Sequence, residues 1–277
     1  VSRYVGGNAE SAPLHKLGTD VWDKAKKRAR DKVHDVAVEL LEMNALRTAR
    51  KGYCFEVPDE EYETFVEGFS CEDTPDQERV MSEVLTDLSS NYPMDRLVCG
   101  DVGFGKTEIA LRAAFIAVHN HKQVALLVPT TILAQQHFQT FRDRFADLPI
   151  QVELLSRFRQ RKDMEAVLES LPNGYPDIVI GTHRLLQKDV LFRDLGLLII
   201  DEEHRFGVRQ KETLKMIRRE VDILTLTATP IPRTLNLGLA GLRSISLIAT
   251  PPPDRRSIKT FVDRKSTRLN SSHALNS

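Results

Sequence analysis

The stretch Gly100-Asp101-Val102-Gly103-Phe104-Gly105-Lys106-Thr107 fits the pattern G-x-x-x-x-G-K-T and lies between two apolar segments. The segment before it, 97–99, predicts a short buried strand, and the apolar residues within 109–118 predict a helix. Glycine lacks a Cβ, so such a loop can curl closely around an anion, and the start of a helix attracts negative charge. The stretch therefore predicts a strand, loop and helix that bind the phosphates of a nucleoside triphosphate. A glycine turn before an ordinary helix is the alternative.

The side chains of this loop have separate expected roles. The ammonium of Lys106 can reach the β- and γ-phosphates, and the hydroxyl of Thr107 can ligate Mg²⁺. The residues of this segment predicted to bind the nucleotide are Gly100, Gly103, Gly105, Lys106, Thr107 and Glu108.

A second motif follows another apolar run. Residues 196–200 predict a strand buried on both faces of a parallel sheet, and the run ends in Asp201-Glu202-Glu203-His204. The carboxyl ends of such strands border the crevice where α/β sheets bind ligands. Asp201 is placed to hold Mg²⁺ through water, and Glu202 to position and deprotonate an attacking water. Either carboxylate alone could be a solvated strand end, but together with the phosphate loop we interpret Lys106, Asp201 and Glu202 as the catalytic residues.

The remaining pattern predicts an α/β fold. Apolar strands alternate with helices, which indicates a mainly parallel sheet with helices on both faces. A long helix over 20–50, with one apolar stripe and a basic start, precedes this unit. The predicted strands are 96–99, 124–128, 152–155, 177–180, 197–200, 223–227 and 244–248.

The order of the motifs resembles superfamily 2 helicases and translocases. Asp-Glu-x-His at 201–204 is followed by Thr227-Ala228-Thr229-Pro230, and Thr74-Pro75-Asp76-Gln77 precedes the phosphate loop. The resemblance implies a RecA-like lobe in which Phe69 and Gln77 bind the adenine of ATP. It also implies that His204, Thr227 and Thr229 relay between nucleotide and DNA. On residue type alone, the two threonines are simply a strand end before a proline.

The amino-acid sequences of segments 100–108, 201–208 and 227–234 are similar to those of the family of bacterial transcription-repair coupling factors. The resemblance covers roughly residues 1–265. Branch-migrating helicases of stalled replication forks are the alternative, although they usually carry Gln where this chain has Glu203. Segments 128–137 and 181–186 resemble the family's nucleic-acid-contacting motifs, whereas polar residues at strand ends are also common caps. The residues implied as DNA contacts are Pro129, Thr130, Arg157, Phe158, Gly181, Thr182, His183 and Arg184.

The resemblance implies the first motor lobe of an ATP-dependent translocase on double-stranded DNA, with ATP and Mg²⁺ as cofactors. In the intact protein it implies displacement of stalled RNA polymerase and recruitment of an excision-repair damage-recognition protein. A second lobe would supply an arginine finger worth about 10³–10⁵ in turnover, so we expect this chain to bind ATP but hydrolyse it poorly. A non-catalytic ATP-binding interaction module and a non-motor phosphotransferase remain open.

Composition is compatible with a cytoplasmic enzyme. The formal net charge is zero, so any DNA-binding surface must be local. The 3 cysteines form no C-x-x-C pair, which favours reduced thiols, and no apolar run approaches the roughly 20 residues that span a bilayer.

The chain is expected to divide into five parts. Residues 1–18 resemble the end of a polymerase-binding barrel, 19–58 a linking helix and connector, and 59–250 the ATP-binding lobe. Residues 251–265 are expected to lead into a second lobe. The Ser- and Asn-rich segment 266–277 reads as a disordered or non-native tail.

Overall fold

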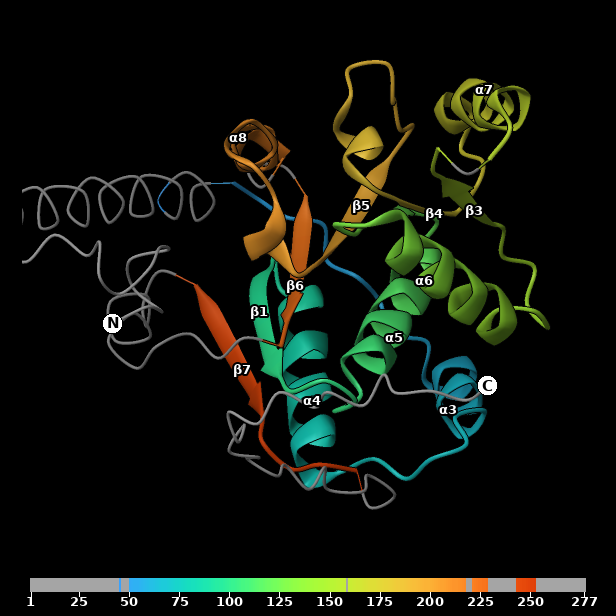
Figure 1. The fold of residues 1–277 in the computed structure, drawn as a ribbon. Helices are drawn as coiled ribbons and strands as arrows, with labels where there is room; N and C mark the ends of the chain where they lie inside the picture. The colour runs from blue at the N-terminus through green and yellow to red at the C-terminus, as the bar shows by residue number, and fades with distance from the viewer. Residues whose placement is uncertain (1–44, 46–49, 158, 218–220, 229–242, 253–277) are drawn as a thin grey trace, which may run out of the picture.

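The computed structural model describes residues 45, 50–157, 159–217, 221–228 and 243–252 (Figure 1). Their centre is a seven-stranded sheet of order β3-β4-β2-β5-β6-β1-β7, and all neighbouring strands run parallel. The strands are β1 (Asp95–Gly100), β2 (Gln123–Leu127), β3 (Val152–Leu155), β4 (Ile178–Gly181), β5 (Leu195–Asp201), β6 (Asp222–Thr227) and β7 (Ser244–Ile248).

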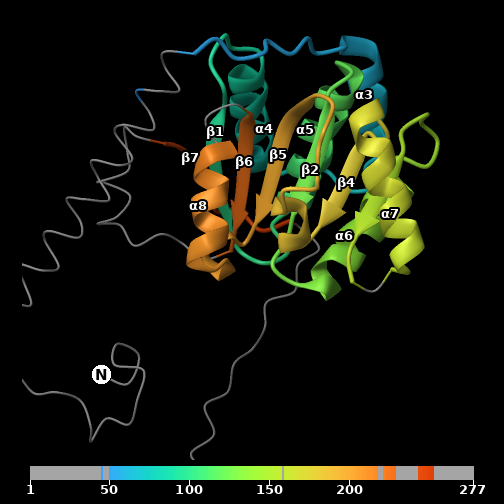
Figure 2. The same ribbon diagram turned by 90° about the horizontal axis from the view of Figure 1, so that it is seen from above.

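Helices cover both faces of the sheet. In Figure 1, α7 and α8 lie above the strands and α3, α4 and α5 below them, and Figure 2 shows the same layers from another side. The helices are α3 (Asp59–Glu67), α4 (Pro75–Leu88), α5 (Lys106–His119), α6 (Thr131–Arg144), α7 (Arg161–Ser170) and α8 (Val208–Ile217). Short 3₁₀ helices cover Leu171–Asn173, His183–Leu186 and Glu203–Arg205. Within these described ranges, every helix is too short or too polar to cross a lipid bilayer.

Alternation along the strands builds two hydrophobic cores. In β2, Val124 and Leu126 pack on the side of α3 to α6, whereas Ala125 and Leu127 pack on the side of α7 and α8. Successive side chains of a strand point to opposite faces, so a strand that is covered on both sides must be apolar throughout. All five residues of β2 are buried accordingly.

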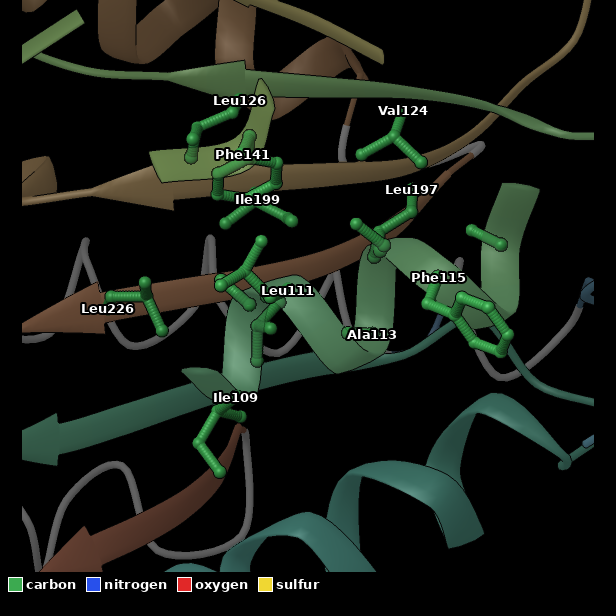
Figure 3. Packing of buried hydrophobic residues seen from close by; sticks show 14 of the residues in the cluster. Ile109, Leu111, Ala113, Phe115, Val124, Leu126, Phe141, Leu197, Ile199 and Leu226 are labelled. Carbon is green, nitrogen blue, oxygen red and sulfur yellow. The ribbon is translucent and has the colours of Figure 1, made fainter. Parts of the chain in front are cut away.

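Helix α5 is the central helix of the larger core. Ten of its 14 residues are buried. Figure 3 shows Ile109, Leu111 and Phe115 of this helix among strand residues such as Leu226 and Ile199. A helix that is apolar nearly all round must be enclosed. The loop before α5 is therefore attached to a helix that is enclosed in the larger core.

The chain after β7 is fastened to the start of α4. Asp76 Oδ2 accepts hydrogen bonds from the backbone N–H groups of Ala249 (3.0 Å) and Thr250 (2.9 Å) and from the Thr250 hydroxyl (2.8 Å). One turn along α4, Arg79 Nη2 donates to the carbonyl of Leu247 at 2.6 Å. The exit of the chain from the sheet is thus fixed on the helix that begins with Pro75.

The predicted fold class and all seven predicted strands are confirmed, with no strand end displaced by more than two residues. The predicted helix over 20–50 lies outside the described residues apart from Ala45 and Arg50, as do the predicted segments 1–18 and 266–277. The division into five parts stays a prediction.

Candidate functional site

The strand order brings the separate sequence motifs to one edge of the sheet. The phosphate loop follows β1, Thr227 ends the neighbouring β6, and Asp201 ends β5 beyond it (Figure 1). The register pairs Cys99 with Thr227 and Asp201 with Leu226. Because all three strands are parallel, their carboxyl ends border the same crevice.

The loop itself has the backbone that its glycines allow. Gly103 and Gly105 both have φ of 79°, in the left-handed region that favours glycine. Gly105 is the N-cap of α5, and a Cβ there would lie 2.0 Å from Nε2 of Gln77. The ammonium of Lys106 donates to the carbonyls of Gly100 (2.6 Å) and Asp101 (2.9 Å). The Lys106 side chain is therefore held by the backbone of the loop that precedes it.

The charge of Lys106 is set by burial and by the acidic strand end. Burial lowers the pKa of Lys106, and the negative charges of Asp201 and Glu202 oppose that shift. Both carboxylates act on the ammonium because the phosphate loop after β1 and the acidic end of β5 lie at the same edge of the sheet. Lys106, Asp201 and Glu202, predicted from two separate motifs, are thus brought together.

Gln77 is bonded at both ends of its amide. Its Oε1 accepts from the N–H of Thr74 at 2.7 Å, which completes a capping box with the Thr74 hydroxyl at the start of α4. Its Nε2 donates to the carbonyl of Phe104 in the phosphate loop at 3.0 Å. Gln77 therefore holds the loop to α4, and an adenine could engage the amide only by replacing these bonds. Phe69 is half-buried, with the guanidinium of Arg112 5.8 Å from its ring centroid.

Glu108 differs from the other predicted nucleotide contacts. Its buried carboxylate accepts from Nε of Arg112 at 2.9 Å and from Nη2 of Arg144 at 3.3 Å. Arg112 is held in turn by both oxygens of Asp73, at 2.6 and 3.0 Å. The side chain of Glu108 thus joins arginines of α5 and α6, and the contact of Glu108 with the nucleotide stays a prediction. The spacing of Glu108 and Arg112, four residues apart on a helix, was the signal for this pair.

The acidic strand end is held by one contact within itself and by contacts with two other segments. Glu202 has φ of 52°, a left-handed conformation that costs about 1–2 kcal/mol for a residue with a Cβ. Its Oε1 accepts from the N–H of Ala228 at 2.8 Å, and its Oε2 lies 3.1 Å from Nδ1 of His204. Asp201 Oδ2 lies 3.1 Å from Nε2 of His137, a contact that the sequence did not indicate. The predicted coupling residue His204 thus touches the predicted base, and Thr227 adjoins Ala228.

Glu203 also has a defined partner. It lies 3.4 Å from Nη1 of Arg243, just before β7, while Nε of Arg243 donates to Asp95 at 2.8 Å. Thr229 lies outside the described residues.

These residues fit Mg·ATP. The loop N–H groups and Lys106 suit phosphate oxygens, and the Thr107 hydroxyl and Asp201 carboxylate are the hard oxygen donors that Mg²⁺ prefers. Among the described residues no group of three His, Cys, Asp or Glu side chains could hold a metal. Mg²⁺ would therefore depend on the phosphates and water for most of its ligands.

A second candidate site is a cavity of about 430 Å³. It lies at the same edge of the sheet as the phosphate loop, next to residues that follow β2, β3 and β4. Six predicted DNA contacts line it, namely Pro129, Thr130, Arg157, Thr182, His183 and Arg184, together with Thr131 and Met164. We call this cavity the polar cleft. Phe158 lies outside the described residues. Segments 129–131, 157–164 and 182–184 are far apart in sequence, so their convergence is a result of the fold.

Two of the predicted DNA contacts have structural partners. A Cβ on Gly181 would lie 2.7 Å from the carbonyl oxygen of Leu155 and 2.9 Å from Cγ of Leu185, so this glycine is required by packing. Arg184 is bound by both oxygens of Asp189, at 2.7 and 2.5 Å, and this pairing holds the pKa of Asp189 below its usual range. A phosphate in the polar cleft would compete with Asp189 for the guanidinium.

Comparison with known proteins supports this assignment of motifs. A family model described as DEAD/DEAH box helicase matches residues 74–237. The chain is 60% identical over 262 residues to the transcription-repair-coupling factor of Haemophilus influenzae and 59% identical to that of Escherichia coli K12. Each match covers 95% of this chain and 23% of the relative, so the chain spans less than a quarter of their length. The expected resemblance to coupling factors is confirmed.

Among solved structures, the chain resembles RecG bound to a three-way DNA junction. The TM-score is 0.69 and the identity 34%, over 86% of this chain and 32% of RecG. The fold is therefore that of a RecA-like helicase lobe.

Proposed function

This chain belongs to the DEAD/DEAH box helicase family, and on that premise we propose that it is the ATP-binding first lobe of a translocase on double-stranded DNA. The observation that carries the proposal is that the phosphate loop with Lys106, the Asp201-Glu202 strand end and the polar cleft meet at one edge of the sheet. A phosphate loop alone would suit many enzymes. The loop, the paired carboxylates and a polar cleft together suit an ATPase that acts on a polymer.

The residues of the site have distinct roles in ATP binding and hydrolysis. Lys106 exchanges its bonds with the loop carbonyls for bonds with the phosphates, since a triphosphate is a stronger partner for an ammonium than a neutral carbonyl. Thr107 and Asp201 would hold Mg²⁺, which when bound would supply neutralisation of the phosphate charge. Glu202 orients the attacking water and accepts its proton, and its bonds with Ala228 and His204 hold the carboxylate in place.

DNA binding in the polar cleft is proposed to be independent of sequence. The Thr130, Thr182 and Arg184 side chains and the start of α6 offer donors that suit backbone phosphates and carry no base code. Binding of this type weakens steeply with salt.

The names of the relatives support a wider role. We propose that the intact protein couples transcription to excision repair by displacing stalled RNA polymerase and recruiting a damage-recognition protein in the cytoplasm. The 60% identity with a coupling factor, against 34% with RecG, favours this role over branch migration. Glu203 agrees with this choice, since branch-migrating helicases usually carry Gln at that position, and in this chain its carboxylate pairs with Arg243.

Hydrolysis is proposed to need a second lobe. An arginine finger is worth about 10³–10⁵ in turnover, more than the roughly 10²–10⁴ that a general base such as Glu202 supplies. The chain alone should therefore bind Mg·ATP and turn it over at the background rate.

The test compares the wild-type chain with Lys106→Ala, each shown to be folded by circular dichroism. Nucleotide affinity and ATP hydrolysis are measured with and without duplex DNA. We expect Lys106→Ala to lose nucleotide affinity and the wild type to show no hydrolysis above that variant. Unchanged affinity in Lys106→Ala would exclude the phosphate-loop assignment. Strong DNA-stimulated hydrolysis by the wild type would exclude the dependence on a second lobe.

A further inference from the structure

Helix α6 connects the polar cleft to the acidic strand end. Thr130 and Thr131, at its start, line the cleft, and the Thr130 hydroxyl caps the helix by accepting from the N–H of Leu133 at 3.2 Å. Six residues further, about 9 Å along a helix, His137 lies 3.1 Å from Asp201. One rigid element therefore touches both candidate sites.

We propose that His137 is a positioning residue that transmits DNA binding in the polar cleft to the carboxylate of Asp201. The proposal rests on the proposed function, because it needs DNA in the cleft and Mg·ATP at Asp201. It assigns a role to a side chain that belongs neither to the phosphate loop nor to the acidic strand end 201–204.

The chemistry of the pair defines what His137 supplies. An ionised carboxylate only accepts hydrogen bonds, so Nε2 of the imidazole carries the hydrogen and donates it to Oδ2. Fixing one oxygen limits the rotation of the Asp201 carboxylate. The ligating group is thereby oriented before Mg·ATP arrives, as second-sphere partners orient metal ligands elsewhere.

His137 cannot move independently of its helix. Its side chain is 10% exposed, and its ring meets the edge of Phe141, with centroids 6.4 Å apart. Ala134, Phe138 and Phe141 of the same helix are buried in the larger core. A small shift of α6 caused by a phosphate at its start would therefore change the His137–Asp201 contact.

Such a link is measurable as a coupling between two ligands. If duplex DNA changes the orientation of Asp201, Mg·ATP must change the affinity for duplex by the same factor, because binding linkage is reciprocal. Couplings of this kind are typically about 5- to 150-fold. Mutation of a residue that only stabilises the fold would lower the affinity for duplex equally with and without the nucleotide, so the ratio of these two affinities would not change.

The experiment measures the Kd of the 277-residue chain for a fluorescent duplex at one fixed salt concentration, with and without Mg²⁺ and a non-hydrolysable ATP analogue. His137→Leu removes the donor but fills the space, and His137→Gln restores a donor near the position of Nε2. Gln139→Ala is the matched control, because Gln139 is an exposed residue of the same helix, lies beyond segment 128–137, and bonds to the exposed residues Asp143 and Arg142.

We expect the wild type and Gln139→Ala to show an equal coupling factor of about fivefold or more. His137→Leu should fall to within about twofold of no coupling, and His137→Gln should recover most of the factor. The proposal is wrong if His137→Leu keeps the wild-type factor, or if the wild type binds both ligands without coupling.

A measurement on the wild type covers the case in which His137→Leu does not fold. The ¹⁵N and ¹H shifts of the His137 imidazole should change when duplex is added without nucleotide, and the absence of any change contradicts the proposal. Failure of the proposed function gives a different result, namely no binding of nucleotide or of duplex, and the inference then falls with it.

Discussion

Replacing Gly105 by alanine tests the contact between the phosphate loop and Gln77. The new Cβ would lie 2.0 Å from Nε2 of Gln77, in a residue whose φ of 79° already disfavours a side chain. The left-handed backbone costs about 1–2 kcal/mol. Displacing the amide breaks its bonds to Thr74 and Phe104, each worth about 0.5–1.5 kcal/mol. We therefore expect the free energy of unfolding to fall by about 2–5 kcal/mol.

Denaturant titration of the free chain measures this loss, and two further variants separate its causes. Gly103→Ala has the same φ at an exposed position, so it should lose only the backbone contribution of about 1–2 kcal/mol. In a Gln77→Ala background, the loss caused by Gly105→Ala should fall to that same value, because no amide remains to be displaced. A cost of Gly105→Ala no larger than that of Gly103→Ala, or a cost that is unchanged in the Gln77→Ala background, would show that the amide of Gln77 is not displaced.

Three further predictions concern other charged groups. Glu202→Gln in a two-lobed protein should leave ATP binding intact and slow hydrolysis by about 10²–10⁴, and wild-type turnover would remove Glu202 as the base. Asp189→Asn should release Arg184 to bind a phosphate, so the affinity for duplex, measured by fluorescence anisotropy, should rise. The slope of log affinity against log salt concentration should become steeper by the amount expected for about one phosphate contact. The Arg79 hydrogen bond, followed by bonds from the chain after β7, holds the pKa of Asp76 well below its usual range. The stabilisation by ionised Asp76 is therefore complete above about pH 4 and is lost as the pH falls. Asp76→Asn should therefore flatten the acid side of a plot of unfolding free energy against pH, and an unchanged plot would contradict this.

The strands could be predicted closely because of their burial. A strand that is covered on both faces reads as a continuous apolar run, and 197–200 lies entirely within the observed β5 (Leu195–Asp201). The loop and the Asp201-Glu202 end could also be predicted, because the chemistry of phosphate and Mg²⁺ restricts residue type at fixed spacing.

Contacts between distant segments could not be predicted in this way. His137 and Asp201 are 64 residues apart, and their meeting depends on where α6 packs across the sheet. Glu108 was assigned to the nucleotide from its position in the motif. The orientation of its side chain follows from Arg112 and Arg144, which it joins between α5 and α6.

The bonds that fasten the chain after β7 to α4 also bear on how force passes through the lobe. Tension applied to the chain beyond Pro252 along the axis of β7 would load the β7–β1 hydrogen bonds together, in shear, instead of opening them one at a time. Asp76 and Arg79 hold the same point from a different element, so part of that tension would be borne by α4. β1 leads directly into the phosphate loop, and Gln77, next to Asp76, is bonded to that loop. A pulling force on the chain after β7 would therefore be resisted by β1 and α4, the two elements that hold the phosphate loop.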